Sequence, residues 1–89
     1  MERVIVKRGT LLIIKYSKQA EKFLKKQDSI TRNRIRNAIN DLPSGDVRKL
    51  QGTDSYRLRV GNYRIIFDRE DNVLYIARID NRRQVYKEV

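Results

Sequence analysis

The stretch SYRLRVGNYRIIFD at residues 55–68 predicts an antiparallel β-hairpin. Gly61 and Asn62 form a two-residue turn signal between two runs in which apolar and polar residues alternate. With this turn, Arg59 on the first strand lies directly opposite Arg64 on the second. Like charges placed opposite each other destabilise a sheet by some fraction of the roughly 0.2–1 kcal/mol that good pairs contribute, so something must offset the repulsion. A bound anion would do so.

The two faces of this hairpin differ in chemistry, because successive side chains point to opposite sides of a strand. One face is wholly apolar and is expected to pack on helices; it carries Tyr56, Leu58, Val60, Tyr63, Ile65 and Phe67. The other face carries Arg57, Arg59, Arg64 and Ile66. The planar guanidinium group of arginine matches a phosphate through two parallel hydrogen bonds. Three such groups within one strand spacing favour a phosphate-binding surface over a generic solvated one, in which acids would be interspersed.

The residues before the hairpin predict one strand and two helices. An apolar, β-branched run at residues 11–16 predicts a first strand. Ser17 can cap a helix whose apolar stripe is Ala20, Phe23 and Leu24, and Asp28 or Ser29 can cap a second helix with the stripe Ile35, Ala38, Ile39 and Leu42. The short break between the helices predicts an antiparallel helix hairpin. Residues 43–52 begin with Pro-Ser-Gly and are expected to form a loop, which carries Arg48 and Lys49.

The residues after the hairpin complete the predicted fold. A tight turn within residues 69–72 leads to a final strand at residues 73–79, with Leu74 and Ile76 on the core face. A helix hairpin packed on one face of a small, mainly antiparallel sheet is an α+β fold. We expect the compact domain to span residues 11–89. Residues 1–10 are expected to form an N-terminal extension outside it, with an edge strand as the alternative.

Composition narrows the chemistry that is open to the chain. Its 89 residues include no histidine and no cysteine, which excludes Ser-His-Asp triads, thiol nucleophiles and the usual zinc ligands. Asp68, Glu70 and Asp71 fall at a hairpin tip, where acids are ordinary turn residues. No metal site and no cofactor are therefore expected.

The charge of the chain points to a polyanionic partner. The net charge is +10 and the isoelectric point is about 10.3, which suits nucleic acid, a membrane surface or an acidic protein. The longest apolar run, residues 11–14, is far shorter than the roughly 20 residues of a membrane helix, and no signal-peptide pattern is found. We therefore expect a cytoplasmic protein with no membrane partner. The cations are mostly arginine from residue 47 onward, so phosphate recognition is expected in that half.

The C-terminal tail, DNRRQVYKEV, adds Arg82, Arg83 and Tyr86. If the tail crosses the basic face of the hairpin, these residues join the same surface. Tyr86 then offers a ring on which a nucleobase can stack and a hydroxyl for a phosphate. A packing role for this tyrosine is the alternative.

The pattern YRLRVGNYRIIF, followed by an apolar strand and NRRQVY and preceded by a Lys-rich helix hairpin and a KLQG loop, resembles the RelE/ParE superfamily of toxins from type II toxin–antitoxin systems. The resemblance covers residues 11–89, and the tail places the chain closest to the RelE branch. In that branch the toxin enters the ribosomal A site and cleaves mRNA without a metal. The ribose 2′-OH attacks the adjacent phosphate and leaves a 2′,3′-cyclic phosphate and a 5′-OH. The resemblance also implies an oligomer with a cognate acidic antitoxin.

The resemblance implies a catalytic role for Arg64, Arg82 and Tyr86. Arg64 would stabilise the charge on the phosphorane, Arg82 would sit beside the leaving oxygen, and Tyr86 would stack on or orient the substrate. RNA-binding residues would be Arg48, Lys49, Arg57, Arg59 and Arg83. Some members have lysine, proposed in one position as the general base, where this chain has arginine. Because the pKa of arginine lies above about 12, arginine is a poor base, and the identity of the base stays open between Tyr86 and none at all.

Two other functions stay open at this stage. One is a ParE-like inhibitor that binds DNA gyrase and catalyses nothing; such a protein has no need for arginines and a tyrosine that converge on the hairpin. The other is a basic nucleic-acid-binding module without toxicity, which growth arrest on induction would exclude.

Overall fold

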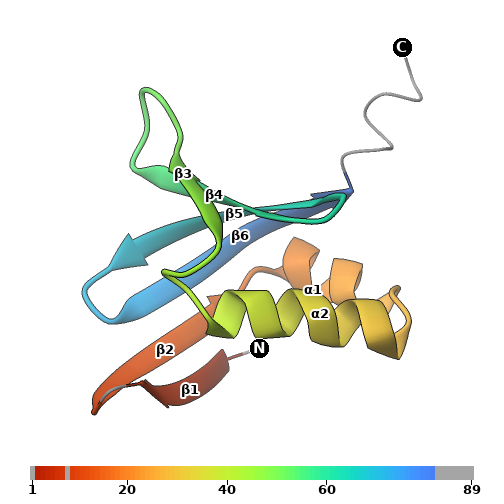
Figure 1. Cartoon of the computed structure of the whole chain (residues 1–89), viewed down its shortest axis with the longest axis horizontal. Coiled ribbons are helices and arrows are strands. Elements are labelled where there is room, and N and C mark those ends of the chain that lie inside the picture. The colour runs from red at the N-terminus through yellow and green to blue at the C-terminus, as the bar shows by residue number, and fades with distance from the viewer. Residues whose placement is uncertain (1, 8, 82–89) are drawn as a thin grey trace.

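The computed structural model describes residues 2–7 and 9–81, which fold into two helices and one sheet (Figure 1). The elements in chain order are β1 (Glu2–Lys7), β2 (Thr10–Tyr16), α1 (Lys18–Lys25), α2 (Ser29–Asn40), β3 (Asp46–Lys49), β4 (Ser55–Val60), β5 (Tyr63–Glu70) and β6 (Val73–Asn81). Both helices lie on the same face of the sheet and leave its other face open (Figure 1). Neither helix has the length and apolar content to cross a membrane.

The sheet is mixed, with the strand order β1-β2-β6-β5-β4-β3. Its only parallel pair among the described residues is β2 with β6; the other neighbours are antiparallel. The α+β class predicted from the sequence is confirmed. The sheet has more strands than expected, because β3 was predicted as part of a loop and β1 was given only as the alternative to an extension.

The two additional strands lie at the two edges of the sheet. Residues 2–7, expected as an extension outside the domain, pair with β2 along their whole length as β1. The expected loop after α2 contains β3, which pairs with β4. In β3, Val47 lies opposite Leu58, a core residue that is 1% exposed, so this edge strand is joined to the core by an apolar cross-strand pair.

The predicted central hairpin is present in the expected register. Arg59 is paired with Arg64 across β4 and β5, and Val60 with Tyr63. Gly61 begins the turn with a φ of +57°, a conformation that glycine adopts without a steric penalty. The apolar face of the hairpin supplies Leu58, Ile65 and Phe67 to the core, as predicted.

Both predicted helix caps are present. The Ser17 hydroxyl accepts a hydrogen bond from the Ala20 N–H at 3.1 Å, and the Asp28 carboxylate accepts one from the Thr31 N–H at 2.7 Å. The hydrogen bond from the Thr31 backbone favours the charged carboxylate and lowers the pKa of Asp28 below its ordinary value. The helices contribute Ala20, Leu24, Ile35 and Ile39 to a core in which each is fully buried.

Strand β6 contains an irregularity that decides which of its side chains face the open side. The pairing with β5 shifts by one residue between Ile66 and Phe67, so that Ala77 is an extra residue in β6. Leu74 and Ile76 point into the core before this bulge, as predicted, and Ile79 points into the core after it. The bulge therefore turns the residues that alternate with Ile79 to the open face of the sheet.

Side chains of α1 hold β6 in place beyond the bulge. Strand β2 pairs with β6 only as far as Ile76, because the chain then turns into α1. The Ser17 hydroxyl donates to the Ala77 carbonyl at 2.7 Å. The Gln19 amide donates to the Ile79 carbonyl and accepts from the Ile79 N–H, both at 2.9 Å. Gln19 thus takes the place of a neighbouring strand and satisfies backbone groups that would otherwise lack a partner.

Candidate functional site

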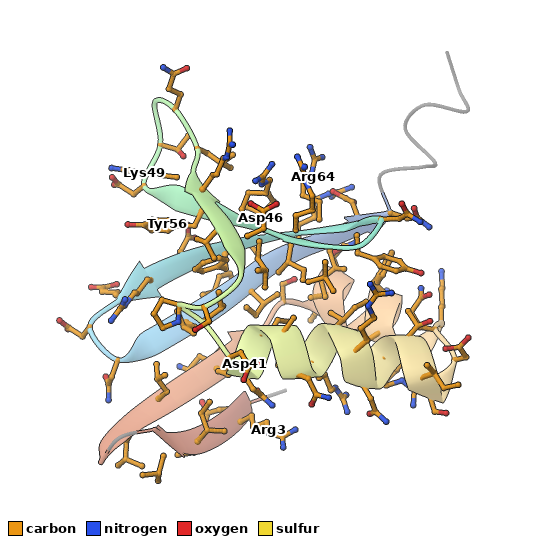
Figure 2. The ribbon with its side chains drawn as sticks, viewed as in Figure 1. Arg3, Asp41, Asp46, Lys49, Tyr56 and Arg64 are labelled. Carbon is orange, nitrogen blue, oxygen red and sulfur yellow. The ribbon has the colours of Figure 1, made fainter. Side chains whose placement is uncertain are left out.

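The open face of the sheet carries two cross-strand rows of side chains, which together we name the arginine face. Cross-strand partners point to the same side of a sheet. The first row runs from β3 to β6 through Asp46, Arg59, Arg64 and Asp80, and the second runs through Arg48, Arg57, Ile66 and Arg78. Figure 2 shows Asp46 and Arg64 on the side of the sheet away from the helices. Five guanidinium groups and two carboxylates thus share one surface.

Two carboxylates flank the like-charged pair at the centre of the first row. The Asp46 carboxylate lies 3.9 Å from Arg59 Nε and 3.4 Å from Arg57 Nη2. On the other side, Asp80 Oδ2 lies 3.7 Å from Arg64 Nη2 and 2.9 Å from Arg78 Nε. The repulsion predicted from the sequence is therefore offset within the protein by these two acids, and a bound anion is not required for it.

Two arginines of the arginine face each have an N–H donor that forms no hydrogen bond. The Nε atoms of Arg57 and Arg64 are buried and have no hydrogen-bond partner. The Arg57 side chain is 14% exposed, whereas the Arg64 side chain is 43% exposed and reaches solvent with its outer edge. An unpaired buried donor costs free energy, and a side-chain shift toward an incoming oxyanion would relieve that cost. The arrangement can bind a phosphate and stabilise negative charge on it.

The predicted RNA-binding residues do not all lie on the same face of the sheet. Arg48, Arg57 and Arg59 share the arginine face with Arg64. Lys49 is paired with Tyr56, whose ring stacks on Phe67 at the edge of the core, so Lys49 belongs to the helix-covered side of the sheet. The predicted residues Arg82, Arg83 and Tyr86 lie outside the described residues.

Sequence reasoning missed the acids of this site. Asp46 was assigned to a loop, although the alternation of Asp46, Val47 and Arg48 is the pattern of a short strand with one polar face. Asp80 reaches the arginine face only because of the bulge at Ala77. The one signal of that bulge in the sequence was the apolar Ile79, which would face away from Leu74 and Ile76 if the strand alternated without a break.

The acids at the tip of the β5–β6 hairpin have ordinary local roles. The Ser55 hydroxyl donates to the Asp68 carboxylate across the two strands. Asp71 occupies the turn with a φ of +53°. Within residues 2–7 and 9–81, no group of three acidic side chains is close enough to hold a metal ion.

A helix pair on one face of an open sheet and a cluster of arginines on the other are the arrangement expected of a toxin of the RelE/ParE superfamily. The family model for the ParE toxin of the type II toxin–antitoxin system parDE matches residues 14–86, and the chain belongs to this family. Within the superfamily it falls in the RelE branch, as the relatives show. The resemblance noted from the sequence is therefore confirmed.

Three relatives carry that assignment. Toxin RelE3 of Methanocaldococcus jannaschii is 37% identical over 51 residues, which are 56% of this chain and 57% of the relative. The structure of a RelB–RelE antitoxin–toxin complex from Methanococcus jannaschii matches with a TM-score of 0.67 and 27% identity over 83% of this chain and 96% of that one. An archaeal RelE–RelB complex from Pyrococcus horikoshii OT3 matches with a TM-score of 0.62 and 32% identity over 78% of this chain and 92% of that one.

Proposed function

We propose that this toxin stops translation by cleaving mRNA on the ribosome. The observation that carries the proposal is the arginine face, where guanidinium groups from three strands surround Arg64 on the side of the sheet that the helices leave open. The names of the relatives, which are RelE toxins, support the same activity. A ribosomal target implies that the protein acts in the cytoplasm.

The proposed reaction is a transesterification within the RNA. The ribose 2′-oxygen forms a bond to the adjacent phosphorus, its proton is lost, and the bond from phosphorus to the 5′-oxygen breaks as that oxygen takes up a proton. The products are a 2′,3′-cyclic phosphate and a 5′-OH. Arg64 stabilises the charge that builds on the phosphorane, which preorganised cations can do without a metal. Arg82 sits beside the leaving oxygen and Tyr86 stacks on or orients the substrate.

The remaining basic residues bind the RNA backbone in this proposal. Arg48, Arg57 and Arg59 lie beside Arg64, and Arg83 follows in the tail. Lys49 is left out of the interface, because it belongs to the other side of the sheet.

A second candidate function follows from the family model, which is named for the ParE toxin. ParE-like members bind DNA gyrase and catalyse nothing. Such an inhibitor would stop supercoiling by purified gyrase and would leave mRNA intact on programmed ribosomes. A nucleic-acid-binding module without toxicity would do neither.

The partner that we propose is an acidic antitoxin that covers the arginine face. Both structural relatives were solved as antitoxin–toxin complexes. The net charge of +10 makes an acidic partner electrostatically favourable. We propose that the two chains form a stable oligomer.

The decisive experiment is to induce the protein and map the 5′ ends of cellular mRNA, then repeat the cleavage on programmed ribosomes. New 5′-OH ends, each matched by a 2′,3′-cyclic phosphate, are expected. Products that end in a 3′-OH would contradict the reaction. Intact mRNA together with inhibited gyrase would favour the second candidate.

Two variants of Tyr86 test its role in the same assay. Tyr86→Phe keeps the ring and removes the hydroxyl, whereas Tyr86→Ala removes both. If the ring stacks on the substrate, the Phe variant retains most of the cleavage rate and the Ala variant does not. If the hydroxyl is the general base, both variants lose activity equally. Full activity in both would remove Tyr86 from the site.

A further inference from the structure

Asp80 is the more firmly held of the two carboxylates on the arginine face. Both of its carboxylate oxygens accept hydrogen bonds from Arg78 Nε, at 2.9 and 3.0 Å. Its side chain is 19% exposed, against 61% for Arg78 and 43% for Arg64. Strand β6 is also fixed at this point by α1, because the Gln19 side chain forms hydrogen bonds with both the N–H and the carbonyl of the neighbouring Ile79. Asp80 is therefore a rigid acceptor beside Arg64.

Asp46 occupies the equivalent place at the other end of the row. It lies on the edge strand β3 and bridges Arg57 and Arg59. Its side chain is 51% exposed, so it is held less firmly than Asp80. Each carboxylate thus contacts two arginines, and the two carboxylates enclose the pair at the centre of the first row.

These ion pairs contribute little to the stability of the fold, because exposed pairs gain little in water and are screened by salt. The ion pairs instead restrict the conformational freedom of the arginine side chains. A long side chain that is held at one edge samples fewer rotamers, so less order must be created when a phosphate binds. Arg64 is contacted at Nη2, while its Nε–H has no partner.

We propose that Asp80 is a positioning residue for Arg64, with Asp46 in the same role for Arg57 and Arg59. Each carboxylate holds its arginines by one edge and directs the rest of the guanidinium group toward the scissile phosphate. The proposal rests on the proposed nuclease function, since these acids act only through the arginines and do not contact the RNA. Each acid also removes one positive charge from the surface, which weakens indiscriminate binding of polyanions.

If Asp80 both positions Arg64 and reduces the positive charge of the surface, removing its charge should slow turnover without weakening RNA binding. Asp80→Asn keeps the size of the side chain and removes its charge. The matched control is Asp71→Asn, which makes the same charge change at the far end of β6, in a turn whose positive φ asparagine accepts. Both variants are compared with the wild-type full chain for binding to a single-stranded RNA oligonucleotide and for cleavage on programmed ribosomes.

For Asp80→Asn we expect RNA binding at least as tight as in the control, together with a kcat that is about tenfold to a hundredfold lower. Asp80→Glu, which keeps the charge, should recover part of the rate. Equal kcat values in Asp80→Asn and Asp71→Asn would overturn the proposal. If Asp80→Asn melts well below the control, Asp46→Asn on the exposed edge strand is expected to show the same split, and its absence there would overturn the proposal as well.

A second measurement does not depend on cleavage. The Nε–H groups of the arginines are observed directly by ¹⁵N NMR, and the Arg64 signal should broaden or shift in Asp80→Asn but not in Asp71→Asn. An unchanged Arg64 signal would overturn the positioning role. A wild-type protein that leaves mRNA intact would overturn the proposed function instead, and the NMR comparison would still decide whether Asp80 orders Arg64.

Discussion

At the scale of single residues, we expect the substitution of Arg64 to change activity and to leave stability nearly unchanged. Its guanidinium group lies between the like charge of Arg59 and the carboxylate of Asp80. Arg64→Ala removes a repulsion and an exposed ion pair together, each worth less than about 1 kcal/mol. We expect Tm to change by less than about 5 °C while toxicity is lost. Thermal melts and growth assays on one variant test both parts; a large drop in Tm would make Arg64 structural, and a folded toxic variant would exclude it from the site.

Arg32 is the matched control for this prediction, because it is an arginine whose role is structural. It donates from Nε to the Leu24 carbonyl at 3.0 Å and from Nη2 to the Gln27 carbonyl at 2.7 Å, at the end of α1. Arg32→Ala makes the same change in charge as Arg64→Ala but removes two charge-assisted hydrogen bonds. We expect a loss of about 2–3 kcal/mol in the free energy of unfolding and an unchanged cleavage rate per folded molecule. Urea melts and cleavage assays on both variants test these roles. A stable but inactive Arg32→Ala variant would contradict the structural role of Arg32.

At the scale of elements, the site depends on how α1 supports the last part of β6. Gln19→Ala removes both hydrogen bonds to the Ile79 backbone and leaves a donor and an acceptor unpaired beside the core. We expect a loss of about 2–3 kcal/mol in the free energy of unfolding and faster amide exchange at Ile79. The control is Gln51→Ala, in the exposed loop between β3 and β4. Equal protection of the Ile79 amide in both variants would mean that the strand pairing alone holds this end of β6.

Strand β6 also shows why the hairpin could be predicted from the sequence and the whole site could not. Gly61 and Asn62 specify a turn, and a two-residue turn determines every pair of the flanking strands, so the partnership of Arg59 with Arg64 was predictable. The bulge at Ala77 has one weak signal in the sequence, the parity of Ile79, and the contact that accompanies it comes from Ser17 at the start of α1, which is 60 residues away in the sequence. Any residue whose face depends on such a tertiary contact, as that of Asp80 does, cannot be assigned by counting alternation.

For a related reason, strand β3 was missed and β1 was given only as the alternative to an extension. Strand β1 exposes Val4 by 56% and Val6 by 70%, and β3 is four residues long with one partly buried side chain. Such segments bury little apolar surface, so their sequences give only a weak strand signal. What identifies them as strands is the neighbouring strand, with Leu58 opposite Val47 in the case of β3.

At the scale of the whole molecule, the distribution of charge determines how the toxin meets its partners. The net charge of +10 acts at a distance and would attract a polyanion, such as the acidic antitoxin or the RNA that we propose, regardless of which face it reaches first. On the arginine face itself, two of the five guanidinium charges are offset by Asp46 and Asp80. We therefore expect the first encounter with a partner and its final recognition to depend on different sets of charges.

That difference gives a prediction for the binding of the cognate antitoxin. The association rate should fall steeply as ionic strength rises, because exposed charges are screened over about 8–10 Å at 0.1–0.15 M salt. Arg59→Gln on the arginine face and Lys25→Gln on α1 remove the same charge, and both should slow association to a similar extent. Only Arg59→Gln should also speed dissociation, because only Arg59 lies on the face that we propose the antitoxin covers. Stopped-flow association and surface-plasmon dissociation rates across a salt series test both parts. A flat association rate would show that charge does not steer the encounter, and equal dissociation rates for the two variants would place the antitoxin on another face.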